Sequence, residues 1–392
     1  MNDKRVTSWR SRLMHPRAVN GPAFSSLAAP THRGSTVVFA SHAAVREGWQ
    51  DHADGYSYGI YGTPTALELA ARIAELEGAR HTFLVPSGQA AIALVYFSFC
   101  QAGSHALVPR NAYGPNKELA AGLLQRCGVD VELYDPAIGA AVASLIRKQT
   151  SLIWCESPGS ITMEIQDVPA IVAAAHAAGV PVALDNTYAA GLLFDAFAHG
   201  VDISLQALTK YAGGHSDVLL GSVSVRDATA YERVGDTHRA MGLCASPDDC
   251  SLILRGLQTL AVRLDVMERS ALQLARWFAD QPGIARVLHP ALPSCEGHHL
   301  WRRDFTGSAS VFSVVFHDQL SKRQVEAFVD ALRLFKIGWS WGGTASLVMA
   351  YPGLDRPLYG SGCLVRFHAG LEDCDDLLAD LEQALRASGL QE

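Results

Sequence analysis

Short apolar runs alternate with alanine-rich helical segments through the first two thirds of this 392-residue chain. Apolar residues three and four positions apart, followed by Gly78, predict a helix over residues 64–78, and the pattern predicts another over 168–178. Runs with the length of a buried strand lie at 81–85, 105–108, 129–134, 151–155 and 180–184. Strands in alternation with helices favour a largely parallel sheet that is covered on both faces.

The remaining parts of the chain have a different pattern. Residues 1–60 have no sustained periodicity and are rich in loop-forming residues, so we expect an extended arm. A larger α/β domain is expected over 61–255 and a smaller α+β domain over 256–392. The elements expected toward the C-terminus are a long amphipathic helix over 251–281, a strand over 310–316, a helix over 322–335, a strand over 363–368 and a helix from Asp373.

Composition and charge narrow the class of protein. Hydrophobic residues make up 49% and charged residues 18% of the chain, which is typical of a globular protein with a large core. A formal charge of -7 gives no net attraction to nucleic acid or to anionic lipid, so we expect neither as a partner.

Cysteine usage and the N-terminus indicate a cytoplasmic protein. The eight cysteines show no Cys-x-x-Cys pair and no spacing that would frame a metal site, which favours free thiols in a reducing compartment. Residues 1–20 lack the apolar core of a secretory signal. The longest apolar run, over residues 90–100, is shorter than the ~20 residues needed to span a bilayer.

Four loops carry candidate chemistry, because sheets of this type bind ligands beyond the carboxyl ends of their strands. Small residues at 86–91 open a helix whose backbone N–H groups could hold a phosphate. Asp185 ends a strand, and Lys210 follows an apolar strand and precedes a glycine pair. Aromatic residues at 338–343 precede Arg366, a pattern typical of a site for a small carboxylate.

Each of these features alone also has an ordinary structural explanation. Small residues commonly open helices, an aspartate often caps a turn, and a lysine at a strand end can extend its amine to water. A buried lysine nevertheless loses its charge readily, as a lysine that forms a Schiff base must. The order of the four segments along the chain is what favours the functional interpretation.

With its segments in this order, the sequence resembles the pyridoxal-phosphate enzymes of cysteine and methionine metabolism, and among them especially the cystathionine β-lyases. The likeness runs from about Tyr56 to the C-terminus. It includes specific stretches at 156–164, 209–211, 214–217, 289–293, 303–308 and 370–373. The resemblance implies a fold-type I α/β enzyme with a mostly parallel seven-stranded sheet, a smaller C-terminal α+β domain, an N-terminal arm, pyridoxal 5′-phosphate as cofactor and no metal.

The resemblance also implies roles for individual residues. Lys210 would carry the cofactor as a Schiff base and move protons, Asp185 would pair with the pyridinium nitrogen, and Tyr113 would stack on the ring. The other implied cofactor contacts are Gly88, Gln89, Asn186, Thr209 and, from a neighbouring subunit, Tyr58. The implied substrate contacts are Arg366, Ser340, Trp341, Glu118 and Tyr61.

Four positions depart from the family pattern. Ile60 and Tyr61 stand where the arm of cystathionine β-lyases carries arginines, Ala207 replaces a frequent serine and Ala345 replaces a common glutamate. Because Lys210 and its neighbours are retained, we expect intact Schiff-base chemistry. The loss of both arginines predicts weaker recognition of a distal carboxylate, and hence a smaller or more apolar S-substituted cysteine as substrate.

The expected function is a carbon–sulfur lyase that releases a thiol, pyruvate and ammonia by β-elimination from cystathionine or a related amino acid. With cystathionine the thiol is homocysteine, as in methionine biosynthesis and trans-sulfuration. The alternatives are γ-elimination or racemisation from the same carbanion, and a regulatory protein that only binds the cofactor. A site completed by Tyr58 of a neighbour implies at least a homodimer, and a homotetramer is typical of the family.

Overall fold

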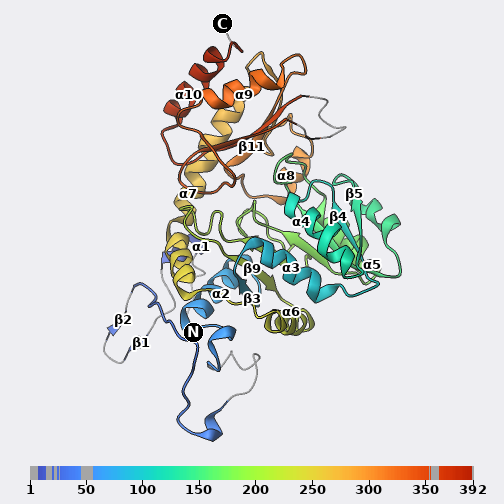
Figure 1. Ribbon diagram of the computed structural model, residues 1–392, viewed down its shortest axis with the longest axis vertical. Helices are drawn as coiled ribbons and strands as arrows, with labels where there is room; N and C mark the ends of the chain where they lie inside the picture. Colours follow the sequence, from blue (N-terminus) through green and yellow to red (C-terminus); the bar gives the residue numbers. More distant parts are fainter. Residues whose placement is uncertain are drawn as a thin grey trace, which may run out of the picture.

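The computed structural model describes residues 8–14, 20–21, 24–25, 27–45, 56–352, 354 and 362–390. Much of the predicted arm therefore lies outside the described residues. Two larger sheets dominate the fold, and the long helix α7 (Pro247–Ala279) runs from one toward the other (Figure 1). No helix in these ranges is both long and apolar enough to cross a membrane.

The larger sheet has seven strands, as expected for the fold class. In spatial order they are β3 (His81–Val85), β9 (Gly221–Val225), β8 (Ile203–Ala207), β7 (Val182–Asp185), β6 (Thr150–Glu156), β4 (His105–Pro109) and β5 (Asp130–Tyr134). Strand β9 is antiparallel to both of its neighbours, and the other pairs are parallel. The carboxyl ends of the six remaining strands therefore meet along one edge, where their loops can form a common site.

Helices cover both faces of this sheet, because successive side chains of a strand point to opposite sides. In β6, Leu152 and Trp154 belong to the buried cluster that includes α3 (Gly88–Phe99) and α6 (Ala228–Ala240). Ile153 and Cys155 belong to the opposite cluster, with α2 (Pro64–Glu77), α5 (Val168–Ala177) and the first part of α7. Apolar side chains on both faces explain why the strands read as continuous apolar runs.

The ends of α2 confirm the prediction made for residues 64–78. The side chain of Thr63 accepts a hydrogen bond from the N–H of Ala66 at 3.4 Å, and Pro64 occupies the first turn, where no N–H is needed. The helix ends at Gly78, whose φ of 69° is a left-handed conformation that glycine adopts without a steric penalty. The glycine stop is a local signal, so the sequence was sufficient to predict it.

The smaller domain contains a five-stranded sheet. Its order is β10 (Ile284–Leu288), β11 (Val311–Phe316), β14 (Leu364–His368), β13 (Leu347–Tyr351) and β12 (Lys336–Ile337). Helices α9 (Lys322–Ala331) and α10 (Cys374–Ala387) contribute to its core together with the last part of α7, and the short α8 (His298–Asp304) precedes β11. Helix α7 contributes to both cores and runs across residue 255. The predicted domain boundary at this residue therefore stays a prediction.

The predicted helix over 322–335 was too long. The helix α9 ends at Ala331, and the side chain of Asp380, on α10, accepts hydrogen bonds from the backbone N–H groups of Arg333, Leu334 and Phe335. This carboxylate draws the chain out of the helix and toward β12. A contact between residues so far apart in the sequence leaves no local pattern.

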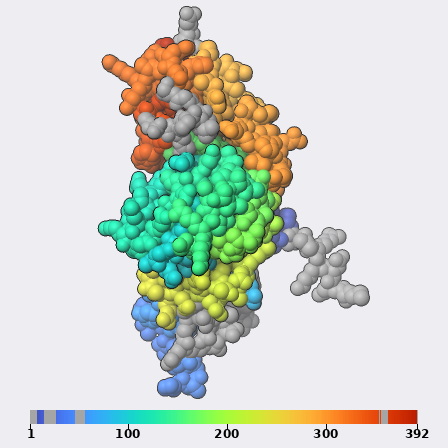
Figure 2. Space-filling view, turned by 90° about the vertical axis from the view of Figure 1, so that its right-hand side faces the viewer, coloured from blue at the N-terminus to red at the C-terminus, as the bar shows by residue number. Residues whose placement is uncertain are grey.

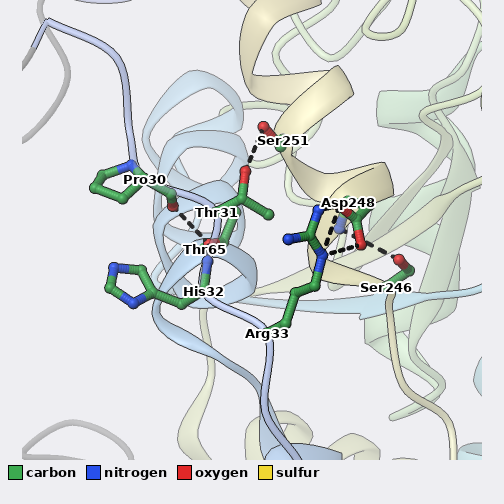
Figure 3. A network of polar contacts seen from close by, with 8 residues as sticks. All are labelled: Pro30, Thr31, His32, Arg33, Thr65, Ser246, Asp248 and Ser251. Atoms are coloured by element: carbon green, nitrogen blue, oxygen red, sulfur yellow. Dashed lines mark hydrogen bonds and ion pairs between the residues drawn. The ribbon is translucent and has the colours of Figure 1, made fainter.

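The described part of the arm packs against α2 and α7 (Figure 3). The hydroxyl of Thr65 donates to the carbonyl of Pro30 at 2.8 Å and accepts from the N–H of His32 at 2.8 Å. Arg33 forms an exposed ion pair with Asp248 at the start of α7. In the space-filling view the residues near 100–200 form a central belt, with the C-terminal part on one side of it and the N-terminal part on the other (Figure 2).

The remaining short elements lie in connecting segments. They are α1 (Trp9–Met14), β1 (Asn20–Gly21), β2 (Phe24–Ser25), α4 (Gly114–Leu119) and the 3-10 helices His42–Ala44, Gly59–Tyr61 and Gly139–Leu145. A π-helical turn, Ala120–Leu124, continues α4. Of these elements, α4 matters most for function, because it follows β4 at the functional edge of the large sheet.

Candidate active site

A cavity of about 590 Å³ lies at the carboxyl edge of the large sheet, with residues of the smaller domain on its other side. Segments that are distant in the sequence converge on it, from β3 to β14. The predicted site residues that line this cavity are Gly88, Gln89, Tyr113, Glu118, Asp185, Thr209, Lys210, Ser340, Trp341 and Arg366. Tyr58, Tyr61 and Asn186 are not among its lining residues.

Lys210 follows β8 and extends its amine into the cavity. Its Nζ donates a hydrogen bond to Oγ of Ser340 at 2.7 Å and lies 5.5 Å from the ring centroid of Trp341. Burial and the nearby positive charge of Arg366 together lower the pKa of this amine to about 8, against the opposing charge of Asp185. Roughly a tenth of the amine is therefore unprotonated at pH 7 and can act as a nucleophile or base.

The chain contains six lysines, and the cavity distinguishes among them. Within the described ranges Lys210 alone lines it. Lys148 and Lys336 are exposed, and Lys322 pairs with Glu326 on the surface of α9. The structure therefore gives a reason for preferring Lys210 that the sequence could not supply.

The loop of the smaller domain is packed closely against Lys210. A Cβ added at Gly342, where φ is 83°, would approach the carbonyl carbon of Lys210 to 3.0 Å. Ser340 has a φ of 94°, which is rare for a residue other than glycine. This strained backbone places the Ser340 hydroxyl at the lysine amine, so the packing of the two segments fixes the environment of the amine.

Two carboxylates stand side by side at the ends of β6 and β7. Glu156 and Asp185 are paired in the register of these parallel strands, and both lie at the cavity. Burial raises the pKa of each, and the charge of Asp185 raises the pKa of Glu156 further. Hydrogen bonds from Thr187 and the charge of Lys210 oppose the shift at Asp185. The pair is suited to a cationic or proton-carrying ligand group.

At the opposite part of the cavity, helix α3 packs closely against β8. Helix α3 begins here at Gly88, and a Cβ at Gly88 would meet the Cβ of Ala207 at 2.7 Å. Gln89 donates through Nε2 to the carbonyl of Pro115 at 3.2 Å, while its buried Oε1 has no partner among the described residues. Thr209 exchanges hydrogen bonds with the backbone of Leu220.

Glu156 connects two other walls of the cavity, a role that the sequence did not reveal. Its carboxylate accepts hydrogen bonds from the N–H of Tyr113 at 2.7 Å and from the N–H of Ser160 at 3.1 Å. The carbonyl of Ser160 in turn accepts from Nη1 of the buried Arg366 at 3.1 Å. One carboxylate thus holds both the tyrosine and the segment that anchors the arginine. A glutamate at a strand end gives no sign of this in the sequence.

A buried chain of hydrogen bonds links the Lys210 segment to the Ser340 loop. The hydroxyls of Tyr211 and Ser310 are 2.7 Å apart, Ser310 Oγ is 2.7 Å from Nδ1 of His368, and His368 Nε2 is 2.9 Å from the carbonyl of Gly343. Burial lowers the pKa of His368 to about 4, so the ring is neutral and donates from Nε2. This connection was also missed, because its members come from four separate segments.

The three remaining predicted residues lie elsewhere in the protomer. Asn186 donates to the carbonyl of Phe194 at 3.2 Å, and its buried Oδ1 lacks a partner among the described residues. Tyr58 is half exposed, and Tyr61 lines a separate hollow beside α2 with Ile60. The predicted contact of Tyr58 and Tyr61 with the site of a neighbouring subunit therefore stays a prediction.

The residues present fit pyridoxal phosphate. Helix α3 begins at the cavity, where its first backbone N–H groups could bind a phosphate. The buried carboxylate of Asp185 suits a protonated ring nitrogen, and Lys210 supplies the amine to which an aldehyde can attach. Oε1 of Gln89, which has no partner among the described residues, adds a further polar atom at this cavity. The fold and the site together define a fold-type I pyridoxal-phosphate enzyme.

Comparison with known proteins specifies the family. The family model described as "Cys/Met metabolism PLP-dependent enzyme" matches residues 11–386. The chain belongs to this family, and it is a pyridoxal-phosphate-dependent enzyme. The cofactor and fold class that the sequence predicted are thereby confirmed.

Individual relatives share most of the chain. It is 41% identical to the cystathionine β-lyase MetC of Escherichia coli strain K12, covering 89% of this chain and 91% of that protein. It is 39% identical to the cystathionine β-lyase of Salmonella typhimurium, covering 97% and 98%. An L-alanine/L-glutamate racemase of Wolbachia pipientis is 34% identical, covering 92% of each chain.

A solved structure agrees with the fold over its whole length. The crystal structure of metB from Corynebacterium glutamicum superposes with a TM-score of 0.90 at 28% identity, covering 100% of both chains. The relatives therefore share both the architecture and the family, while their names include more than one reaction.

Proposed function

We propose that the protein is a carbon–sulfur lyase that catalyses β-elimination from cystathionine or a related S-substituted cysteine. The observation that carries this proposal is the partly neutral amine of Lys210, placed in one cavity with Asp185 and Arg366. The cystathionine β-lyases among the relatives support it. In the net reaction the Cα–H and Cβ–S bonds break and water is consumed, and the products are a thiol, pyruvate and ammonia.

Different side chains bind the substrate and transfer its proton. Pyridoxal phosphate, when bound, supplies a ring that accepts the electron pair left at the substrate Cα. Arg366 binds the substrate α-carboxylate and orients the Cα–H bond toward Lys210. The Lys210 amine removes this proton and returns it to the departing sulfur, and the Ser340 hydroxyl holds the amine in place.

The cofactor contacts in this proposal follow the resemblance. Asp185 would pair with the ring nitrogen, Asn186 would lie near the ring oxygen, and Tyr113 would stack on the ring. Gly88, Gln89 and Thr209 would hold the phosphate, with Tyr58 from a neighbouring subunit. Trp341 forms the substrate pocket together with Arg366 and Ser340, while Glu118 and Tyr61 contact the distal part of the substrate.

The products distinguish this function from its alternatives. Purified protein is incubated with L-cystathionine, L-cystine and L-methionine, and the keto acid is identified. Pyruvate with an equal amount of thiol supports β-elimination. Formation of 2-oxobutyrate would indicate γ-elimination, and loss of optical activity without a keto acid would indicate racemisation. The racemase among the relatives is the reason for keeping that alternative.

The pKa of Lys210 predicts how the cofactor-free protein takes up pyridoxal phosphate. Only the unprotonated amine attacks the aldehyde, and burial holds its pKa at about 8. The initial rate of uptake should rise about tenfold per pH unit below this pKa and level off above it. Stopped-flow absorbance measures this rate. A rise that continues to pH ~10 would show an ordinary lysine and contradict the assignment.

Glu156 should act as a positioning residue. Glu156→Gln replaces one of the two carboxylate oxygens that accept hydrogen bonds from Tyr113 and Ser160. We therefore expect kcat/KM to fall about tenfold, mainly because KM rises. Steady-state kinetics and the melting temperature measure the effect. Glu164→Gln, in the same segment but outside the cavity lining, is the control. Equal kinetic losses in both variants would assign Glu156 a merely structural role.

Assembly and location complete the proposal. We propose a homodimer or larger homo-oligomer in the cytoplasm, consistent with Tyr58 lying outside the cavity of its own chain and with eight free cysteines. The division into an arm at 1–60 and domains at 61–255 and 256–392 is likewise proposed. A fully active monomer in size-exclusion chromatography would contradict the shared site.

A further inference from the structure

The charges around the cavity limit which substrates fit it. Among the described residues that line it, Lys210 and Arg366 are the only lysine or arginine side chains. The proposed function uses both, one for proton transfer and the other for the α-carboxylate. The lining also carries the acidic groups of Glu118, Glu156 and Asp185. A second carboxylate on the substrate would therefore meet acidic side chains and, among the described lining residues, no further lysine or arginine.

Two aromatic side chains cover the part of the cavity next to Arg366. The rings of Trp339 and Tyr351 meet edge to face with centroids 5.9 Å apart, and the Arg366 guanidinium lies 5.5 Å from the Tyr351 centroid. Both residues line the cavity, together with the apolar side chains of Ile161 and Leu219. We call Trp339 and Tyr351 the aromatic wall. Burial raises the pKa of the Tyr351 hydroxyl and the nearby Tyr113 raises it further, so the wall continues toward the proposed ring-stacking tyrosine.

We infer that the aromatic wall makes the enzyme selective for S-substituted cysteines whose substituent is apolar and carries no carboxylate. This inference rests on the proposed β-elimination and specifies its substrate class: cystathionine, whose substituent carries a carboxylate, becomes a poorer substrate than an apolar S-alkylcysteine. Once Arg366 holds the α-carboxylate, the wall beside it offers the next surface to the rest of the substrate. Aromatic rings stabilise hydrocarbon by burial, whereas a carboxylate buried there without a partner loses its hydration.

The segment 56–62 brings no positive charge that could bind a distal carboxylate. It reads Tyr-Ser-Tyr-Gly-Ile-Tyr-Gly and contains no charged residue. If this segment reaches the cavity of a neighbouring subunit, as proposed for Tyr58, it adds aromatic and apolar surface and supplies no positive charge. In the assembly proposed above, this segment would thus add to the uncharged surface of the aromatic wall.

A matched pair of substrates tests the inference on the purified holoenzyme. S-isopentyl-L-cysteine and S-carboxyethyl-L-cysteine have substituents of similar size and branching, but only the second carries a distal carboxylate. Pyruvate release should give a kcat/KM at least about tenfold higher for the isopentyl compound. Equal values, or a preference for the carboxyethyl compound, would overturn the inference. In both cases pyruvate is still formed, so the proposed β-elimination would stand.

Variants of the wall provide a second test that does not depend on the absolute activity. Trp339→Lys adds a positive charge at an exposed position, and it should reduce the isopentyl-to-carboxyethyl ratio at least about tenfold. Trp339→Gln removes the ring without adding charge and should reduce the ratio less. Equal ratios in the lysine variant and the wild type would contradict a role of the wall in selectivity. Absence of pyruvate from every thioether would instead reject the proposed function.

Discussion

Replacing Lys210 by alanine is expected to lower kcat for pyruvate formation by about 10⁴-fold, with the fold and the melting temperature nearly unchanged. The variant loses the base that takes the Cα proton and the acid that returns it to sulfur. It also loses the amine that anchors the cofactor. Because the amine lies in a cavity and donates one hydrogen bond, to Ser340, its removal leaves the packing of the surrounding segments intact.

Two controls separate the chemistry of Lys210 from its charge. Lys210→Arg keeps a positive charge near Ser340 but provides no titratable amine, so it should be as inactive as the alanine variant. Added methylamine should restore part of the activity of Lys210→Ala, because a small amine can enter the space left by the side chain. Ordinary turnover by Lys210→Ala would show that another group performs the proton transfers.

Replacing Arg366 should produce the second large effect, and it should depend on the substrate carboxylate. Arg366→Ala is expected to lower kcat/KM by about 10²- to 10³-fold, because an ionic contact made in a buried site is lost. Arg366→Lys keeps the charge but loses the planar fork, so a loss of about tenfold is expected. Steady-state kinetics with an S-alkylcysteine measures both values.

The carboxamide of the same S-alkylcysteine is the control for this prediction. It lacks the carboxylate, so it should react slowly with the wild type and lose little more on Arg366→Ala. Equal losses for the acid and the carboxamide would mean that the substitution disturbs the site in general. In the structure Arg366 also contacts Ser160 and Tyr351. The loss of these contacts affects the acid and the carboxamide alike, so the difference between the two substrates reports the carboxylate contact alone.

The sequence predicted those parts of the fold that depend on local patterns. The helix α2 has a threonine cap and a terminal glycine, and the buried strands of the large sheet are short apolar runs. Strand β9 was missed because Gly221-Ser222-Val223-Ser224-Val225 alternates polar and apolar residues although both of its faces are buried. The hydroxyl of Ser224 lies 2.8 Å from that of Thr82, so a polar contact inside the core replaces the expected apolar one.

The site was predictable to the extent that it follows the order of family motifs. The structure brings Lys210, Asp185 and Arg366 to one cavity, as that order suggested. Glu156 and His368 could not be recognised, because their importance depends on neighbours that only the folded chain provides. The aromatic wall is a further example: Trp339 lies in the segment that the sequence singled out, but its contact with Tyr351, at the end of β13, is visible only in the folded chain.

The identity of the lysine that carries the cofactor is the most direct test of this account. The holoenzyme is treated with borohydride, which fixes the cofactor on its lysine, and the digested protein is analysed by mass spectrometry. We predict that the cofactor is found on the peptide containing Lys210, with one molecule bound per chain. Modification of Lys4, Lys117, Lys148, Lys322 or Lys336 instead, or of no lysine, would contradict the account.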